Sequence, residues 1–214
     1  MSNGDRMLKI YVAGPEVFLP NAREIMDRKV ELCRSYGFQA ICPGDLEIPP
    51  QPTKKAFGLA ISTVDEDMMN RADGVIANLT PFRGISADVG TCFELGYMCA
   101  QGKLVAAYTN VAENYFERAA RYYHDRITED AKGIRRGPGG LSLENFDMID
   151  NLMIHGGIER RGGHIAIHTA AADALYTDLT AFEKCLKALS AQVENRVHPN
   201  EGLRPDELDA ANDG

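Results

Sequence analysis

The chain has 214 residues, 44% of them hydrophobic, which is enough for one α/β domain with a substantial core. Its formal net charge of −8 argues against a nucleic-acid polymer as partner, because such a partner requires a clustered basic surface. No apolar run approaches the ~18 residues that would suggest a membrane span, and the start lacks the pattern of a secretory signal. We therefore expect a soluble, cytoplasmic protein that binds a small, mostly uncharged molecule.

The first half of the chain alternates short apolar runs typical of strands with segments of helical periodicity. The pattern predicts strands at 8–13, 38–42, 74–79 and 104–108, and helices at 20–36, 56–72 and 89–101. Strands that alternate with helices pair in parallel through right-handed crossovers. We therefore predict a single doubly wound, open parallel sheet, flavodoxin-like or Rossmann-like, with helices on both faces. Ligands bind such sheets beyond the carboxyl ends of the strands.

The second half is less regular. One helix is expected between 110 and 140, together with a basic, glycine-rich stretch at 132–140. We interpret that stretch as a flexible surface insertion rather than a phosphate-binding loop, because no P-loop or GxGxxG spacing is present. A strand at 164–168 and a helix at 170–192 complete a domain placed at 7–192. The polar residues 193–214 are predicted to be a disordered tail.

The helix predicted at 89–101 contains a single charged residue, Glu94. A buried carboxylate is costly unless it is paired or used, and a helix packed on a sheet buries much of its surface. The alternative is that Glu94 lies on a narrow solvent-facing stripe, and periodicity alone leaves both open. Asp88, just before the helix, is well placed to cap its N-terminus.

A second acid, Asp65, falls within the apolar stripe of the helix predicted at 56–72. The stripe consists of Phe57, Ile61, Val64, Met68, Met69 and Ala72. An acid on an inward-facing stripe indicates either that the predicted helix register is wrong or that the acid has a function, and we favour a function. Tyr11, in the first strand, either packs in the core or extends its phenol to a carboxylate at the edge of the sheet. Paired acids suit glycosyl chemistry, in which one attacks the anomeric carbon while another assists the leaving group.

Three segments of the chain resemble the nucleoside 2-deoxyribosyltransferase family. They are residues 10–18 (IYVAGPEVF), Asp65 ahead of the third strand, and residues 81–97 (PFRGISADVGTCFELGY). The segment at 151–153 is similar to the part of the family that completes a neighbouring subunit's site. The resemblance covers roughly 8–108 and 146–157, and its most specific part is the block from Asp88 through Glu94 to Gly96.

The resemblance implies that Glu94 attacks C1′ of a 2′-deoxynucleoside and that Tyr11 orients its carboxylate. Asp65 would assist proton transfer to the departing base, and Asp88 would bind the sugar hydroxyls. Further implied substrate contacts are Gly14, Phe18, Gly90, Asn151 and Met153. The last two would come from a neighbouring subunit, so the family implies a homo-oligomer with shared active sites. It also implies transfer of 2-deoxyribose to a free nucleobase without metal or cofactor.

Other functions stay open on the sequence. An N-glycosidase on the same scaffold would use water as acceptor, and a nucleotide-binding module would leave Glu94 without a chemical role. A related branch hydrolyses deoxynucleoside 5′-monophosphates and has serines where Asp88 and Asn151 stand. An anionic Asp88 would repel a phosphate, unless Arg83 or the 132–136 stretch compensates, so we favour an unphosphorylated substrate. Asp45 and Glu47 are candidates for base contacts, and the base preference is left open.

The cysteines and histidines form no pattern typical of a metal site. No CxxC pair occurs, and the cysteines are expected to be buried thiols in a reducing compartment; they are Cys33, Cys42, Cys92, Cys99 and Cys185. His155, His164 and His168 lie close together in sequence, but without an accompanying Asp or Cys pattern we expect them to be surface or core residues.

Overall fold

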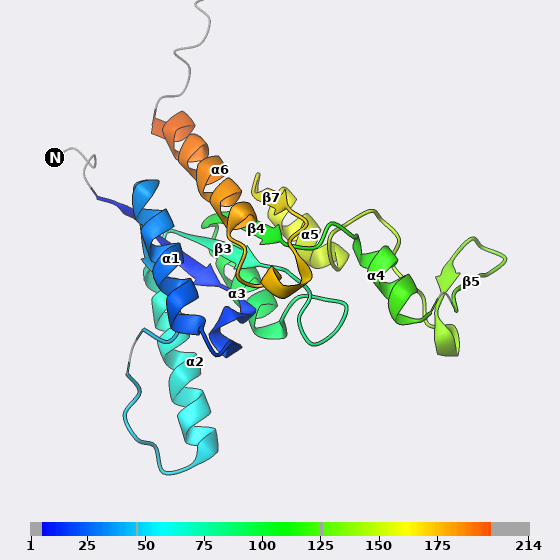
Figure 1. Cartoon of the computed structure of the whole chain (residues 1–214), viewed down its shortest axis with the longest axis horizontal. Coiled ribbons are helices and arrows are strands. Elements are labelled where there is room, and N and C mark those ends of the chain that lie inside the picture. The colour runs from blue at the N-terminus through cyan, green and yellow to red at the C-terminus, as the bar shows by residue number, and fades with distance from the viewer. Residues whose placement is uncertain (1–5, 46, 125, 198–214) are drawn as a thin grey trace, which may run out of the picture.

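A computed structural model describes residues 6–45, 47–124 and 126–197. Its centre is a five-stranded sheet in which every neighbouring pair of strands is parallel (Figure 1). The strands are β1 Leu8–Ala13, β2 Phe38–Ile41, β3 Gly74–Asn78, β4 Leu104–Thr109 and β7 His164–Ile167. Their spatial order is β2-β1-β3-β4-β7. This is the flavodoxin-like order, in which the order of successive strands reverses between β1 and β3, so the predicted doubly wound fold is confirmed.

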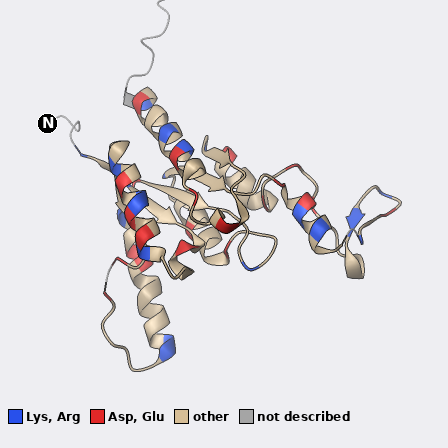
Figure 2. Ribbon diagram, in the orientation of Figure 1, with Lys and Arg blue, Asp and Glu red and all other residues tan. Residues whose placement is uncertain are grey.

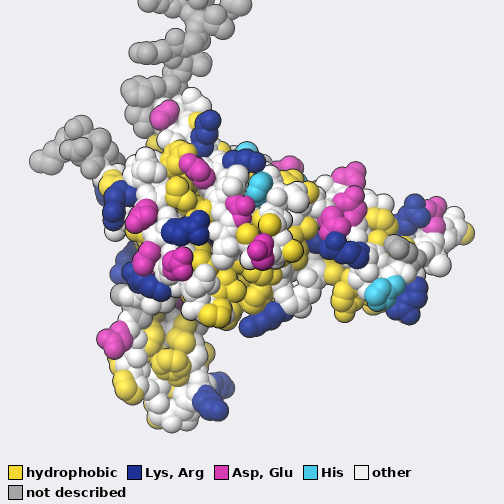
Figure 3. All heavy atoms as spheres, in the orientation of Figure 1, with side chains coloured by type: hydrophobic (Ala, Val, Ile, Leu, Met, Phe, Trp, Pro, Cys, Tyr) yellow, Lys and Arg dark blue, Asp and Glu magenta, His cyan; other side chains and the backbone are white. Residues whose placement is uncertain are grey.

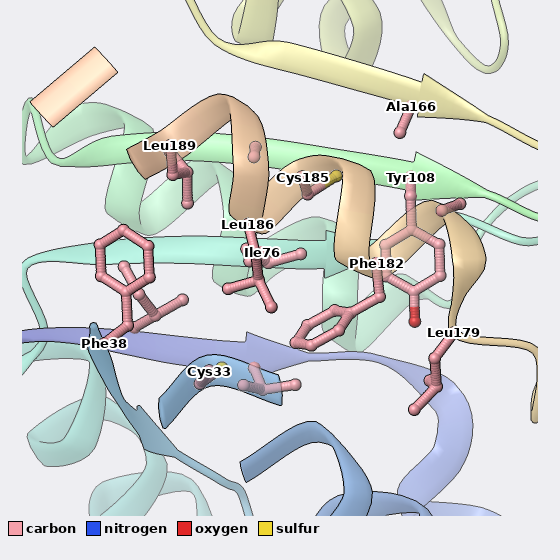
Figure 4. Close-up of a cluster of buried hydrophobic side chains, with 14 of the residues drawn as sticks. Cys33, Phe38, Ile76, Tyr108, Ala166, Leu179, Phe182, Cys185, Leu186 and Leu189 are labelled. Carbon is pink, nitrogen blue, oxygen red and sulfur yellow. The ribbon is translucent and has the colours of Figure 1, made fainter. Parts of the chain in front are cut away.

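Helices cover both faces of the sheet. One face carries α1 (Ala22–Ser35) and α6 (Thr180–Val197), and the other carries α2 (Lys54–Arg71), α3 (Val89–Ala100) and α5 (Leu152–Glu159). In β4, Ala106 and Tyr108 face the core beneath α1 and α6, while Val105 and Ala107 face the core beneath α2, α3 and α5. This alternation explains why β4 is apolar throughout. Figure 4 shows the core beneath α1 and α6, where Phe182 lies against Tyr108.

Helices in the first half of the chain begin and end at residues that favour helix termini. Helix α1 stops before Gly37, which has a φ of +79° that a side chain would make costly. Helix α2 begins after Thr53, whose hydroxyl accepts a hydrogen bond from the Ala56 amide at 3.0 Å. Helix α3 begins after Asp88, which caps it in the same way through the Thr91 amide. The predicted capping role of Asp88 is therefore confirmed.

The apolar stripe predicted for α2 is buried only in its C-terminal half. Met68, Met69 and Ala72 lie in the core, but Phe57 is 43% exposed and Ile61 38% exposed. The reason is geometric, because the N-terminal half of α2 runs beyond the edge of the sheet (Figure 1). Figure 3 shows hydrophobic side chains on the surface of this projecting part.

The second half differs most from expectation. The predicted surface insertion contains α4 (Tyr115–Tyr122) and a hairpin of β5 (Thr128–Glu129) and β6 (Arg135–Arg136), followed by a 3-10 turn at Pro138–Gly140. The insertion stands away from the sheet (Figure 1) and carries several basic residues (Figure 2). It has a defined structure of its own, because the Asp130 carboxylate accepts hydrogen bonds from two backbone amides and from Arg136.

The C-terminal part of the chain differs from the sequence prediction in one additional helix and in the two ends of the last helix. Helix α5 is absent from the prediction. The single helix expected at 170–192 is a 3-10 turn, Ala172–Ala174, and then α6, which starts at Thr180 because the Asp178 carboxylate accepts a hydrogen bond from the Thr180 amide. Helix α6 reaches Val197, so residues 193–197 of the predicted tail are helical. The rest of that prediction, 198–214, lies outside the described residues. None of the described helices is long and apolar enough to cross a membrane.

Candidate active site

The phenol of Tyr11 donates a hydrogen bond of 2.8 Å to Oε1 of Glu94. Tyr11 comes from β1 and Glu94 from the second turn of α3, so the contact crosses from the sheet to the helix above it. Tyr11 is fully buried, and this burial, together with the charge of Glu94, raises the pKa of the phenol well above its ordinary value. Tyr11 therefore stays protonated and acts as a donor to the carboxylate.

Burial raises the pKa of Glu94 to about 7. The Tyr11 hydrogen bond opposes this shift, while the nearby charges of Asp65 and Asp88 add to it. A carboxyl group with this pKa is partly neutral at neutral pH, and its ionised form is poorly solvated. The alternative in which Glu94 lies on a solvent-facing stripe does not fit this environment.

A cavity of about 480 Å³ opens in front of Glu94 at the carboxyl edge of the sheet. Its size lies within the range of small-molecule sites. It is lined by Gly14, Val17, Phe18, Ala22, Arg23, Met26, Pro43, Gly44, Asp45, Ile61, Asp65, Asp88, Gly90, Thr91 and Glu94. These residues follow β1, β2 and β3, so the cavity lies where the strand order switches direction.

The structure brings together most residues that the sequence singled out. Glu94, Asp65, Asp88, Gly14, Phe18 and Gly90 all line this cavity, and Tyr11 contacts Glu94. Burial raises the pKa of Asp65, so this acid holds its proton more readily than an exposed one. Oδ2 of Asp88 accepts the capping bond from the Thr91 amide at 3.1 Å, so Asp88 both caps α3 and lines the cavity.

Asn151 and Met153 lie outside this cavity. Asn151 caps α5, and its side-chain amide donates a hydrogen bond of 2.6 Å to Glu144. Met153 is 74% exposed. Their expected place in a neighbouring subunit's site stays a prediction.

A buried charge network behind the cavity was not found from the sequence. Oε1 of Glu16 accepts hydrogen bonds from Lys29, from Asn78 at 2.9 Å and from Tyr108 at 2.8 Å. The Glu16 and Lys29 side chains are both fully buried. Glu16 belongs to the 3-10 turn Pro15–Phe18 after β1, so the network fixes this turn to α1, β3 and β4. The only sequence signal is the position of Glu16 within the segment 10–18.

Gly14 is required by this packing. A Cβ at this position would lie 2.0 Å from Oε2 of Glu16 and 3.0 Å from Cβ of Asn78. The backbone at Gly14 therefore lies so close to the buried network that any residue with a side chain would clash.

A second buried pair holds the loop that leads into α3. Arg118, from α4, donates hydrogen bonds to the carbonyl of Ile85 at 2.7 Å and to that of Ile149 at 2.6 Å. Its guanidinium also lies 3.3 Å from Asp150, and Asp150 accepts a hydrogen bond from the Ala87 amide at 2.9 Å. Asp88 follows directly, so this pair positions the start of α3. Neither residue gave a signal in the sequence.

We expect Arg118→Met to lower the free energy of unfolding by about 3–5 kcal/mol, because it leaves the buried carboxylate of Asp150 without its cation. Urea unfolding measures the change. Arg121→Met is the matched control, because Arg121 pairs with Glu113 at the surface, where about 0–1 kcal/mol is expected. Equal losses in the two variants would contradict the special role of Arg118.

Arg83 takes part in an aromatic cluster at the mouth of the cavity. Its guanidinium lies 4.7 Å from the ring centroid of Phe18 and 4.6 Å from that of Phe82, and the two rings are stacked. Arg83 has a φ of 55°, which is uncommon for a residue other than glycine. The Arg83 guanidinium therefore packs on aromatic faces in this structure, and Arg83 is not among the residues that line the cavity.

Two of the three histidines that the sequence singled out have partners within the protein. His155 lies 3.1 Å from Glu159, and His168 lies 3.2 Å from Asp178. Over the described ranges, no group of three or more His, Cys, Asp or Glu side chains is arranged to hold a metal ion. All five cysteines are free thiols, and four of them are buried.

The fold and the site together define a flavodoxin-like α/β protein with an acidic cavity at the topological switch point of its sheet. Within that class, residues 10–153 match the family model described as nucleoside 2-deoxyribosyltransferase. The chain belongs to the nucleoside 2-deoxyribosyltransferase family.

The chain is also similar to individual proteins. The chain is 31% identical over 198 residues to an uncharacterised protein of Schizosaccharomyces pombe, covering 87% of this chain and 90% of the yeast protein. It is similar to the structure of a 2-desoxiribosyltransferase from Leishmania mexicana, with a TM-score of 0.54, 28% identity and coverage of 79% of this chain and 94% of the other. A conserved protein from Enterococcus faecalis, with a TM-score of 0.52, 18% identity and coverage of 86% and 99%, shares the fold.

Proposed function

We propose that this protein transfers 2-deoxyribose between nucleobases through a glycosyl ester on Glu94. The observation that carries the proposal is the partly buried Glu94 carboxylate, which receives the Tyr11 hydrogen bond and lines the cavity. Desolvation makes a carboxylate a better nucleophile, and the Tyr11 phenol fixes its orientation. The family assignment supports the same chemistry.

The proposed reaction has two displacements at one carbon. In the first, an oxygen of Glu94 forms a bond to C1′ while the bond from C1′ to the base nitrogen breaks, and the electron pair stays on the base. Asp65, whose raised pKa favours its protonated form, donates a proton to the departing base. In the second, a nitrogen of the incoming base attacks C1′ and gives up its proton to Asp65. The ester bond breaks, and its electron pair returns to the Glu94 carboxylate. Two inversions give net retention.

The charge of the cavity supports an unphosphorylated nucleoside as substrate. Asp88 lines the cavity, and its carboxylate would repel a phosphate dianion placed beside it. Asp88, at the start of α3, is the residue we assign to the sugar hydroxyls.

The reaction can be tested by incubating the protein with a 2′-deoxynucleoside and a different free base, followed by chromatography. We expect a new nucleoside that contains the added base. Free deoxyribose without new nucleoside would replace the proposal with hydrolysis by an N-glycosidase. Neither product across purine and pyrimidine substrates would favour a binding module.

We expect Tyr11→Phe to shift the acid limb of the pH profile of kcat/KM to higher pH. The nucleophile must be ionised, so activity falls as pH drops through the pKa of Glu94, about 7. The Tyr11 hydrogen bond lowers that pKa, and its removal therefore raises it. At neutral pH we expect about a 10-fold to 100-fold loss of kcat/KM, the value of a hydrogen bond to a charged group.

A profile of unchanged shape, only reduced in height, would contradict this role of Tyr11. Tyr97→Phe is the matched control, because the Tyr97 phenol bonds to Asn70 at the surface and should leave the profile in place.

A further inference from the structure

Arg23 and Asp45 line the cavity away from the carboxylates of α3. Asp45 follows β2, whereas Asp88 and Glu94 follow β3, and β1 lies between these two strands. Strands β2 and β3 are two strand spacings apart, about 10 Å, which places Asp45 and the carboxylates of Asp88 and Glu94 on different sides of β1. Arg23 lies in the first turn of α1, on the same side as Asp45.

The two side chains form a donor and acceptor pair. Nη1 of Arg23 lies 3.4 Å from Oδ1 of Asp45, and Nη2 lies 2.8 Å from Asp27, one turn further along α1. The Arg23 and Asp45 side chains are 77% and 44% exposed, so their pairing adds little to stability. A guanidinium has five N–H donors, and a carboxylate has about four acceptor sites, so both groups retain capacity for a ligand.

Apolar side chains also line the cavity. They include Phe18, Met26 and Ile61, and the backbones of Gly14 and Gly44 contribute further surface. Such walls suit the flat faces of a heteroaromatic ring. No Asn or Gln side chain is found among the described residues of the lining, so Arg23 and Asp45 are the groups placed to contact the far edge of such a ring.

We propose that Arg23 and Asp45 recognise the edge of the nucleobase farthest from the glycosidic bond and thereby select purines. The inference rests on the proposed function, in which the sugar lies beside Glu94. From there, the two fused rings of a purine extend further toward Asp45 than the single ring of a pyrimidine. Guanine, hypoxanthine and adenine each present an N–H donor beside an acceptor on that edge, which matches a carboxylate beside a guanidinium.

The test compares kcat/KM for 2′-deoxyinosine, thymidine and the 2′-deoxynucleoside of unsubstituted purine, with adenine as acceptor base. Unsubstituted purine has the same two rings but no N–H donor at its far edge. We expect 2′-deoxyinosine to exceed both of the others by at least about tenfold, because it is the one whose N–H donor reaches the Asp45 carboxylate, and a hydrogen bond to a charged group is worth about that factor or more. Thymidine used as well as 2′-deoxyinosine would overturn the proposal.

The variant Asp45→Ala separates recognition from general damage. We expect it to lower kcat/KM about tenfold for 2′-deoxyinosine and by less than about twofold for the other two nucleosides. Asp27→Ala is the matched control, because Asp27 is the other partner of Arg23 and does not line the cavity. It should retain the wild-type preference. An equal loss for all three nucleosides in Asp45→Ala would contradict the assignment.

A binding measurement distinguishes failure of this inference from failure of the proposed function. Titration calorimetry with free hypoxanthine and free thymine requires no turnover. Tighter binding of hypoxanthine, weakened by Asp45→Ala, would support purine selection even if neither transfer nor hydrolysis occurred. Equal binding of the two bases, binding unaffected by Asp45→Ala, or no binding of either base would overturn it, whatever the activity.

Discussion

Replacing Glu94 with glutamine is expected to lower kcat by at least about a thousandfold, because an amide cannot form the glycosyl ester. Glutamine keeps the size of the side chain and can still accept the Tyr11 hydrogen bond. The loss should therefore appear in turnover rather than in folding. Steady-state consumption of a 2′-deoxynucleoside measures it.

The covalent step can be observed directly in the wild-type protein. A slow deoxyribosyl donor, followed by mass spectrometry of the intact chain and of its peptides, should show one added deoxyribosyl group within α3. The same treatment of Glu94→Gln should add nothing. A label on any other residue, or full activity in the variant, would remove Glu94 from the mechanism.

The thermal stability of Glu94→Gln shows whether its loss of activity comes from damage to the fold. The pKa of Glu94 is raised from 4.5 to about 7, so protonation stabilises the folded state, fully below pH 4.5 and no longer once pH has risen through about 7. Glutamine is neutral at every pH. At pH 8 the variant should therefore unfold at a higher temperature than the wild type, and a lower one would indicate damage to the fold.

The second large effect is expected at Lys29. The Lys29→Met variant leaves the Glu16 carboxylate fully buried with only Asn78 and Tyr108 as donors, and we expect a loss of about 3–5 kcal/mol in the free energy of unfolding. Denaturant unfolding at neutral pH measures the loss. Because Glu16 fixes the turn beside Gly14, the variant should also bind substrate more weakly.

A double variant tests whether the loss comes from an uncompensated charge. Lys29→Met combined with Glu16→Gln removes both charges, so it should be more stable than Lys29→Met alone. An additive loss in the double variant would show that the pair is not coupled. Arg135→Met, at an exposed pair with Glu129, should change stability by only about 0–1 kcal/mol.

The first half of the fold could be predicted because its signals are local. The apolar run of β3, the glycine after α1 and the caps at Thr53 and Asp88 each act within a few residues. Helix α5 could not be found in this way, because its sequence contains two adjacent glycines and is held by packing against α3. The hairpin was also missed, because its strands have two residues each and depend on the Asp130 hydrogen bonds.

The residues of the candidate site and its supports also differ in whether the sequence alone could identify them. Glu94 is the only charge in a helix, and Asp65 interrupts an apolar stripe, so each departs from its own surroundings and could be singled out. Lys29 and Arg118 look like ordinary surface cations in the sequence, and only tertiary contacts bury them. Their partners Glu16 and Asp150 are distant in sequence or lie in irregular segments, so the pairing could not be predicted.

The insertion between β4 and α5 leaves and rejoins the body of the protein at almost one point, where the Tyr115 amide donates a hydrogen bond of 2.9 Å to the carbonyl of Met148. The tip of the hairpin beyond it includes no residue of the acidic cavity. Exposed loop tips whose ends are close together accept added sequence with little strain. The turn around Gly133 is therefore a suitable place to graft a reporter or an affinity handle while leaving the cavity at the edge of the sheet untouched.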